Sequence, residues 1–297
     1  MKKNQYLIIT VDFTELKLLN LRWLIFILMC IIFTMLASFK IEPTIKTVEV
    51  KTASQPEPKT VIFSKDEFIV KRQQLVFKYL IAHKVNRVDQ LDTEKIKEMN
   101  TQIAIMFKKL LLNDNTIRQH VYDFFTDNKE VNKIETSLME QTKFHIPASI
   151  ILAQSALETG WGSKVVNNNY FGIKDKSQFS TPIITTEYFN AKEVKRNKRK
   201  IISKQIVIKK GKKLYKCKVK DRFKNYGSAW ESFREHSLFL STNIRYAPLF
   251  TKGKNYKEWA NMIGSTKYGG VGYATSPVYG EQLKSIIEKY NLHLLDY

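Results

Sequence analysis

The sequence has few acidic residues and almost no cysteine. Its 297 residues include 28 Asp and Glu against 49 Lys and Arg, a formal net charge of +21. Such an excess implies an anionic neighbour, either nucleic acid, a membrane surface or an anionic wall polymer. Cys30 lies in an apolar run and Cys217 in a lysine-rich segment, which argues against a disulfide framework. No paired Cys and His spacing suggests a metal site, and no cofactor is expected.

The positive charge is concentrated in one part of the chain. Between Ala191 and Arg222, 15 Lys or Arg stand against two acids, a local excess of +13, so the remaining residues account for only +8. The hydrophobic content of 43% is that of a globular protein. The basicity therefore belongs to one segment and not to the whole fold.

The longest apolar run lies near the N-terminus. Residues 23–39 are 17 positions without a charge, closed by Lys40. As a helix they would span roughly 26 Å, close to the hydrocarbon core of about 30 Å. A short N-terminal segment, residues 1–22, precedes the run, and it is longer than the region that usually precedes the apolar part of a signal peptide. We therefore expect an uncleaved single-pass anchor. Lys and Arg are about equal on its two sides, so the positive-inside rule does not orient it.

The remaining chain divides into a linker and two folded regions. Residues 40–63 contain three prolines among Thr, Lys and Glu, which is typical of an extended linker. Residues 64–124 show two apolar stripes at helical spacing, opened by a capping pattern at Ser64. We expect them to form a helical spacer, or an accessory layer on the domain that follows. Residues 125–297 are the predicted catalytic domain, of α+β class and mainly α.

A strongly apolar helix is predicted over 148–158, with Pro147 at its first position and glycines at its end. Glu158 closes this helix, where burial would raise the pKa of its carboxyl group. A carboxylic acid still protonated near neutral pH can give a proton to a leaving-group oxygen. The Thr-Gly-Trp-Gly turn that follows is expected to bring the Trp161 ring beside the acid. The alternative is a helix-terminal glutamate that faces solvent, and the residue chemistry alone favours neither.

Strand-like alternation appears in two stretches after this helix. Residues 181–189 and 201–215 alternate apolar and polar side chains and predict a long β-hairpin or small sheet, a β-lobe of about 181–222. Helices resume at Ser228, and Trp230 is expected to pack against the core. No internal repeat is visible.

Four blocks in the same order resemble the glucosaminidase family of peptidoglycan hydrolases, of the mannosyl-glycoprotein endo-beta-N-acetylglucosaminidase type. They are IPASIILAQSALETGWG at 146–162, NNYFGIK at 168–174, FKNY with Ser228 and Trp230 from 223, and GYATSPVY at 272–279. The resemblance covers roughly residues 125–296. It implies a lysozyme-like fold, with a helical lobe facing a small β-lobe across a glycan cleft. It also implies hydrolysis of the β-1,4 bond after N-acetylglucosamine, with Glu158 as the general acid.

Glycoside hydrolysis usually needs a second carboxylate. The segment Thr-Thr-Glu-Tyr at 185–188 resembles the hairpin block where some members of the family place it, so Glu187 is our candidate. The alternative is an exposed strand glutamate bonded to a lysine of the hairpin. Glu193 is a weaker competitor, and the N-acetyl group of the substrate could assist instead.

Further site residues follow from the same resemblance. Tyr273 matches a cleft tyrosine that would orient the sugar or stabilise charge, and the alternative is a packed tyrosine with a bonded hydroxyl. Asn169, Phe171 and Trp161 are predicted to bind substrate, with Asn169 and Phe171 shaping the cleft floor, although Phe171 could also be a core residue. Ser276 stands where the family usually has Asp, a mild change because both cap helices well.

The predicted protein is a cell-membrane hydrolase whose catalytic domain lies in the periplasm or on the extracellular face. Its partners would be peptidoglycan glycan strands and the membrane. The basic segment 191–222 is longer than the hairpin of the family and would grip anionic wall polymer or lipid, or else form a solvated mobile arm. Nucleic acid is disfavoured, because aromatic residues interleave poorly with the lysines. The rival functions are a lytic transglycosylase of the same fold and a non-catalytic wall-binding scaffold.

Overall fold

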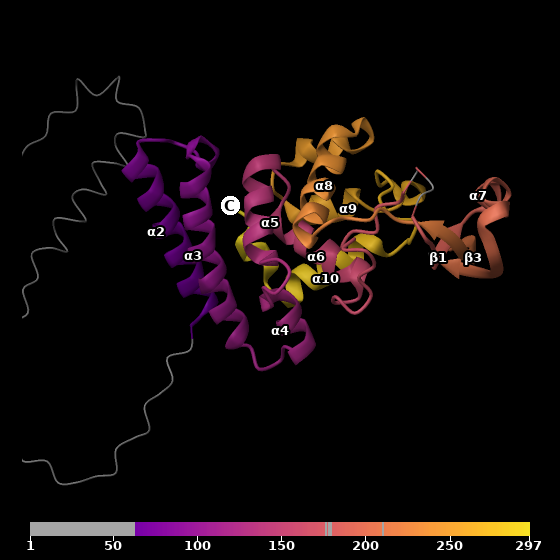
Figure 1. The fold of residues 1–297 in the computed structure, drawn as a ribbon, viewed down its shortest axis with the longest axis horizontal. Helices are drawn as coiled ribbons and strands as arrows, with labels where there is room; N and C mark the ends of the chain where they lie inside the picture. The colour runs from indigo at the N-terminus through magenta and orange to yellow at the C-terminus, as the bar shows by residue number, and fades with distance from the viewer. Residues whose placement is uncertain (1–62, 176, 178–179, 210) are drawn as a thin grey trace, which may run out of the picture. The chain divides into compact units, whose positions relative to one another are not determined.

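The computed structural model describes residues 63–175, 177, 180–209 and 211–297, all within one compact unit, Thr60–Tyr297 (Figure 1). This part of the chain is mainly helical, with a three-stranded antiparallel sheet. The predicted segment 1–22, the anchor 23–39 and nearly all of the linker 40–63 lie outside the described residues. Among the residues that are described, no helix is both long and apolar enough to cross a membrane.

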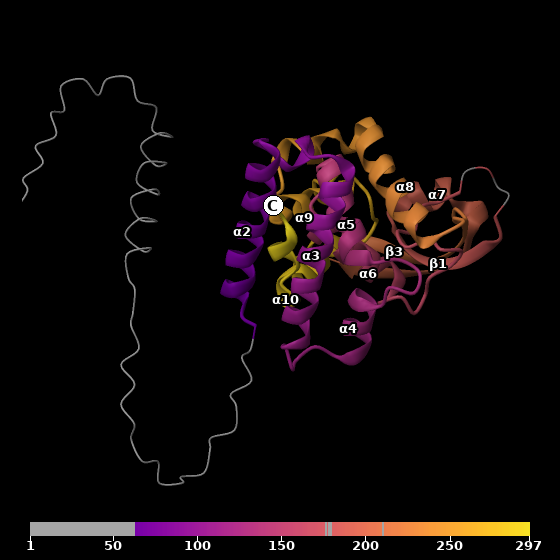
Figure 2. The ribbon, with the colours of Figure 1, turned by 60° about the vertical axis from the view of Figure 1, so that its left-hand side comes forward.

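Two long helices open the described chain, α2 (Lys65–His83) and α3 (Thr93–Leu112), which lie side by side in Figures 1 and 2. The Ser64 hydroxyl accepts a hydrogen bond from the backbone N–H of Glu67 at 3.1 Å, as the capping pattern predicts. Helix α3 packs on α5 (Lys133–Phe144), and one apolar core continues from α2 through both. The predicted domain boundary at residue 125 falls inside this core and stays a prediction.

The C-terminus connects this layer to the helix that bears Glu158. The Arg72 guanidinium of α2 donates a hydrogen bond to the backbone carbonyl of Asp296 at 3.0 Å. The Asp296 carboxylate in turn accepts hydrogen bonds from the backbone N–H of Ser149, at 2.9 Å, and from its hydroxyl, at 2.6 Å. Ser149 lies in the first turn of α6 (Ala148–Thr159), whose free N–H groups favour a negative charge. The N-terminal helices therefore help to fix the start of α6.

Helix α6 lies in the middle of the helical core. Helices α5, α9 and α10 contact it, and all nine residues from 148 to 156 are buried, as expected for so apolar a helix. Gly160 ends the helix in the left-handed conformation, at φ 54°.

The other helices are α4 (Gln119–Thr126), α8 (Ala229–Thr242), α9 (Tyr256–Met262) and α10 (Tyr279–Lys289). Short 3-10 turns lie at Val88–Gln90, Lys198–Lys200, Ile244–Lys252, Thr266–Tyr268 and Leu292–Leu295.

The sheet consists of β1 (Pro182–Phe189), β2 (Ile201–Lys209) and β3 (Lys212–Arg222), in the order β1-β3-β2. The predicted strand 201–215 is in fact two strands, because the chain turns at Gly211, where φ is +70°. Helix α7 (Ala191–Arg196) joins β1 to β2 and lies beside the sheet in Figure 1. The lysine-rich segment is thus part of an ordered sheet and its connections.

One core prediction is wrong. Trp230, expected against the core, is 49% exposed, whereas Phe233 on the same helix is fully buried. Trp230 lies in the first turn of α8, where the Arg234 guanidinium covers its ring at 5.2 Å from the centroid. The Trp230 ring therefore lies at the surface and not in the core.

Candidate active site

Glu158 occupies the last turn of α6, where the apolar helix reaches the surface. Part of the residue is open to solvent, while protein atoms crowd its carboxyl group. The Tyr279 hydroxyl, at the start of α10, donates a hydrogen bond to its Oε1 atom at 2.8 Å. The acid is thus accessible from one side and held from the other.

Desolvation dominates the titration of Glu158 and raises its pKa to about 7. The hydrogen bond from Tyr279 opposes this shift, the negative charge of Glu187 adds to it, and the positive charge of Lys174 lowers it. The C-terminal end of the α6 dipole acts in the same direction as burial. The carboxyl group is therefore protonated in a large fraction of molecules at neutral pH, as a proton donor requires.

A chain of buried hydrogen bonds supports Tyr279 from behind. The Gln154 amide, one turn before Glu158 on α6, donates to the Tyr279 hydroxyl at 3.1 Å. The Gln154 carbonyl oxygen lies 3.1 Å from Nε2 of His236, on α8. Burial lowers the pKa of His236 to about 3, so its ring is neutral and donates through Nε2. This order of donors directs the Tyr279 proton at Glu158.

Gly172 lies against the other carboxylate oxygen. A Cβ atom at this position would be 3.2 Å from Oε2 of Glu158, and the backbone has φ +63°, which favours glycine. Tyr279 occupies Oε1, so Oε2 is the oxygen left to bear the transferable proton. The absence of a side chain at Gly172 keeps space beside that oxygen.

Glu187 is on strand β1, with its side chain only 14% exposed. Its Oε1 atom forms an ion pair with Nζ of Lys174 at 3.0 Å, and its Oε2 atom accepts a hydrogen bond from the Thr275 hydroxyl at 2.5 Å. The partner is a lysine from the chain before β1 and not one of the hairpin. Because Glu187 raises the pKa of Glu158, the two carboxylates act on each other electrostatically.

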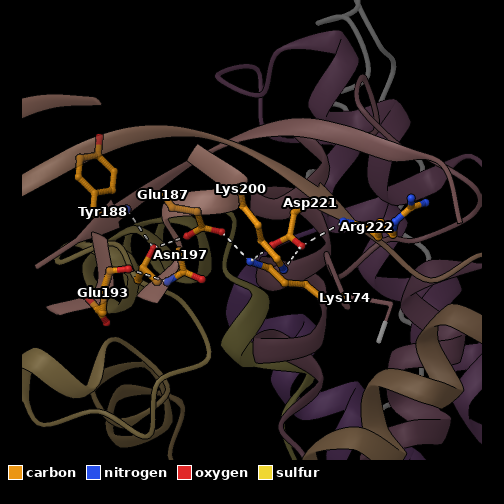
Figure 3. Close-up of polar contacts among 9 residues, drawn as sticks. Lys174, Glu187, Tyr188, Glu193, Asn197, Lys200, Asp221 and Arg222 are labelled. Carbon is orange, nitrogen blue, oxygen red and sulfur yellow. Dashed lines mark hydrogen bonds and ion pairs between the residues drawn. The ribbon is translucent and has the colours of Figure 1, made fainter. Parts of the chain in front are cut away.

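Lys174 links Glu187 to a second acid. Its Nζ atom is 2.8 Å from Asp221 on β3, and Asp221 also pairs with Lys200 at 3.0 Å, as Figure 3 shows. Burial opposes the charge of Lys174, but Glu187 and Asp221 outweigh it and raise the pKa of the lysine. Burial also opposes ionisation of Asp221, whose pKa is nevertheless lowered by the two lysines. Both groups therefore stay charged and fix the position of Glu187.

Tyr273 and Phe171 lie together beneath the site. The Tyr273 hydroxyl donates a hydrogen bond to the Phe171 carbonyl at 2.8 Å, and its ring stacks on Tyr279 with centroids 5.9 Å apart. Burial raises the pKa of Tyr273 well above its usual value. Phe171 is 1% exposed and stacks on His236 at 3.9 Å. In this structure both residues support the floor, and direct contact of Tyr273 with sugar stays a prediction.

Asn169 and Trp161 are engaged in packing and loop structure. The Asn169 amide donates to the carbonyls of Ile173 and Lys224, at 2.9 and 3.1 Å, which shapes the loop that contains Gly172. The Trp161 ring lies in an aromatic cluster with Phe124, Phe125 and Tyr290, with centroid distances of 5.9, 5.8 and 5.2 Å. A substrate contact for either residue stays a prediction.

The sequence did not single out Tyr279, Gln154, His236 or Lys174. Gln154 could have been found from its spacing, because residues four apart lie on the same face of a helix. Tyr279 ends the fourth block, but its contact with a residue 121 positions earlier is a tertiary effect.

Glu193, the weaker candidate acid, caps α7 and pairs with Lys267 at 2.8 Å. Among the described residues, no three His, Cys, Asp or Glu side chains gather as metal ligands would.

A separate surface cavity of about 580 Å³ lies beside the start of α8, lined by residues such as Asp175, Tyr226 and Trp230. Neither Glu158 nor Glu187 lines it. The chemistry of the site is therefore better located by the two carboxylates than by the size of the hollow.

Comparison with known proteins gives consistent results. The family model described as mannosyl-glycoprotein endo-beta-N-acetylglucosaminidase matches residues 135–292. Exo-glucosaminidase LytG of Bacillus subtilis is 30% identical over 162 residues, which cover 52% of this chain and 48% of that protein. Peptidoglycan hydrolase FlgJ of Salmonella typhimurium is 30% identical over 154 residues, or 48% of this chain and 40% of FlgJ.

Solved structures also match part of the chain. The catalytic domain of the autolysin Auto from Listeria monocytogenes has a TM-score of 0.40 and 22% identity, and the match covers 67% of this chain and 97% of that domain. This chain spans less than half the length of the two curated relatives.

Proposed function

This chain belongs to the glucosaminidase family, and on that premise we propose that it hydrolyses the glycan strands of peptidoglycan with Glu158 as general acid. The observation that carries the proposal is the surroundings of Glu158, a partly exposed residue whose crowded carboxyl group has a pKa of about 7. The names of LytG and FlgJ, a glucosaminidase and a peptidoglycan hydrolase, support the choice of substrate. The helical body beside a small sheet agrees with a lysozyme-like fold, which is part of the proposal.

The acid step begins with Glu158 protonated on Oε2. The proton moves to the oxygen of the β-1,4 bond after N-acetylglucosamine, and the bond between that oxygen and the anomeric carbon breaks. Tyr279 holds Oε1 throughout and stabilises the carboxylate that forms. The space beside Gly172 is where the leaving-group oxygen would approach.

Glu187 is the proposed second group, which activates water or stabilises the positive charge at the anomeric carbon. Its ion pair with Lys174 and its hydrogen bond from Thr275 hold the carboxylate in one orientation. Two acids in unlike surroundings are the usual arrangement for an acid and its partner.

The proposed location of this reaction is the outer side of the cell membrane. The uncharged run at 23–39 would be the anchor, and the described domain would act in the periplasm or on the extracellular face. Accessibility of an engineered cysteine on the domain to a membrane-impermeant thiol reagent in intact cells tests this. Labelling only after lysis would contradict it.

Digestion of purified peptidoglycan by the full chain, with mass spectrometry of the products, tests the proposed reaction. We expect fragments that end in reducing N-acetylglucosamine, and internal cleavage would give long fragments early in the digestion. Glu158→Gln should reduce the rate by about 10²- to 10⁴-fold, because the amide has no transferable proton. Glu94→Gln, an exposed residue of α3, is the matched control and should retain the rate.

Other products would overturn the proposal. Anhydro sugars would identify a lytic transglycosylase, and release of single terminal sugars would identify an exo-acting enzyme. Unaltered glycan together with retention on peptidoglycan would indicate a wall-binding scaffold. Activity that survives Glu158→Gln would remove the proposed acid.

A further inference from the structure

The basic segment 191–222 keeps most of its charge available at the surface. Its two acids are already engaged, since Glu193 caps α7 and pairs with Lys267, and Asp221 pairs with Lys174 and Lys200. Neither acid therefore neutralises the lysines of the middle strand, β3. A surface with this much uncompensated charge attracts an anionic partner.

Three lysines of β3 form one row. Lys216, Lys218 and Lys220 are exposed, whereas Cys217, Val219 and Asp221, which alternate with them, are buried. Because successive side chains of a strand point to opposite faces, the three ammonium groups share one face and repeat at roughly 6.8 Å. Among the residues that the structure describes, none of the three has an acidic partner.

The neighbouring strands complete this face without adding an acid. Lys218 lies between Thr186 of β1 and Ser203 of β2, and Lys216 lies between Tyr188 and Gln205. Directly opposed residues of antiparallel strands present their side chains on the same face. The lysine row is thus flanked mainly by uncharged hydrogen-bonding groups. We name it the lysine face and define it by Lys216, Lys218 and Lys220.

The carboxylate of the candidate site belongs to the other face. Glu187 is opposite Cys217 in the register, one position from the Thr186–Lys218 pair. Side chains at these adjacent positions point in opposite directions. A molecule on the lysine face would therefore leave Glu187 free for a second ligand.

We propose that the lysine face binds a linear wall polymer with repeating phosphodiester groups, which retains the domain on the wall while the opposite face of the sheet serves the glycan. Lysine ammonium groups are compact charges with three donors each and suit isolated phosphates along a flexible chain. This binding does not depend on the proposed hydrolysis, because it uses a different face.

A lipid surface fits less well. Interfacial membrane binding needs basic and large apolar side chains together. The exposed isoleucines Ile206 and Ile208 of β2 are opposite Tyr215 and Lys213 in the register, so they belong to the face of Cys217. Among residues paired in register with the three lysines, one is large, apolar and exposed, Ile184, opposite Lys220. Ile202 is also exposed and lies in the bulge of β2 between Ile201 and Ser203.

The test measures binding of the full chain, in detergent micelles, to purified walls that contain a poly(glycerol phosphate) polymer. The variant Lys216→Gln, Lys218→Gln, Lys220→Gln should bind about tenfold more weakly or worse, with a reduced salt dependence. The matched control is Lys65→Gln, Lys78→Gln, Lys97→Gln on α2 and α3, all exposed, which removes the same net charge. It should bind like the wild type.

A second arm uses walls stripped of the polymer with hydrofluoric acid. Wild-type binding should fall to the level of the lysine-face variant, and all three proteins should digest the stripped peptidoglycan at one rate. Equal digestion also shows that the variants fold. If the triple variant does not fold, Lys218→Gln alone should still weaken binding by a few-fold.

Three results would overturn the proposal. Equal losses in the two triple variants would show that only net charge matters. Undiminished binding of the wild type to stripped walls would remove the polymer as the partner. Flotation with anionic and with zwitterionic vesicles measures lipid binding. If the lysine-face variant loses more binding to anionic vesicles than to walls, while zwitterionic vesicles show no such loss, lipid is the partner.

Discussion

The two carboxylates of the candidate site are supported by contrasting regions of the molecule. Glu158 ends a buried helix in the large apolar core, with a tyrosine hydroxyl as its hydrogen-bond partner. Glu187 is on a strand that contributes to a small apolar cluster, whose buried residues are Phe189, Cys217 and Val219, and an ion-pair network holds it. Apolar surroundings thus raise the pKa of the Glu158 carboxyl group, whereas an ion pair orients the Glu187 carboxylate. The two glutamates therefore differ in their surroundings and not in their residue type.

Removing Glu187 and removing Lys174 should shift the pKa of Glu158 in opposite directions. Glu187→Gln should lower kcat/KM by about 10²-fold, as expected for loss of an acid–base group. It should also move the alkaline limb of the pH–rate profile to lower pH, because Glu187 raises the pKa of Glu158. Lys174→Gln should move the limb to higher pH, because the lysine lowers that pKa.

Lys200→Gln is the matched control for Lys174→Gln. Lys200 also pairs with Asp221 but does not contact Glu187, so the limb should stay in place. Shifts of the Glu187 and Lys174 variants in the same direction would contradict the electrostatic coupling of the two regions.

Gly172→Ala tests whether the space beside Oε2 of Glu158 is needed. The added Cβ would lie 3.2 Å from that oxygen, and the left-handed backbone would be strained by about 1–2 kcal/mol. We expect kcat/KM to fall by roughly tenfold, the effect of about 1.4 kcal/mol on the barrier. Gly211→Ala has a similar φ, +70°, with no atom within 4 Å of the new Cβ. It should lose stability but keep kcat/KM, and equal kinetic losses would show that strain alone is responsible.

The two stacked tyrosines should differ in a smaller way. Tyr279→Phe removes the hydrogen bond that lowers the pKa of Glu158, so the alkaline limb should move to higher pH with a few-fold loss of kcat/KM. Tyr273→Phe removes a hydrogen bond to the Phe171 carbonyl and should leave the limb in place. A shift of the limb in the Tyr273 variant and not in the Tyr279 variant would reverse their roles.

Sequence reasoning located the helix that ends at Glu158 because that helix rests on a local pattern. The apolar run before Glu158 predicts a buried helix, and the structure has one. The residue chemistry alone did not decide between a desolvated and a solvent-facing carboxyl group, and in the structure burial raises the pKa of that group. The capping residue Ser64 was recognised for the same reason. These features need only the spacing of neighbouring residues.

The sheet and the supporting contacts were harder to predict. Alternation continues across Gly211, so a turn between two strands looked like one strand. The partners of the acids, Tyr279 and Lys174, come from other elements and reach the site through the tertiary fold. Trp230 was placed in the core because helical spacing does not show which face is covered.

The titration of Glu158 itself is the most direct test of the roles proposed for the two carboxylates. The side-chain carboxyl carbon of labelled glutamate can be followed by NMR, with Glu158→Gln identifying its signal. We predict a midpoint at about pH 7 in the wild type, moving down in Glu187→Gln and up in Lys174→Gln. A midpoint near 4.3, the value of an unperturbed glutamate, in all three proteins would contradict the account.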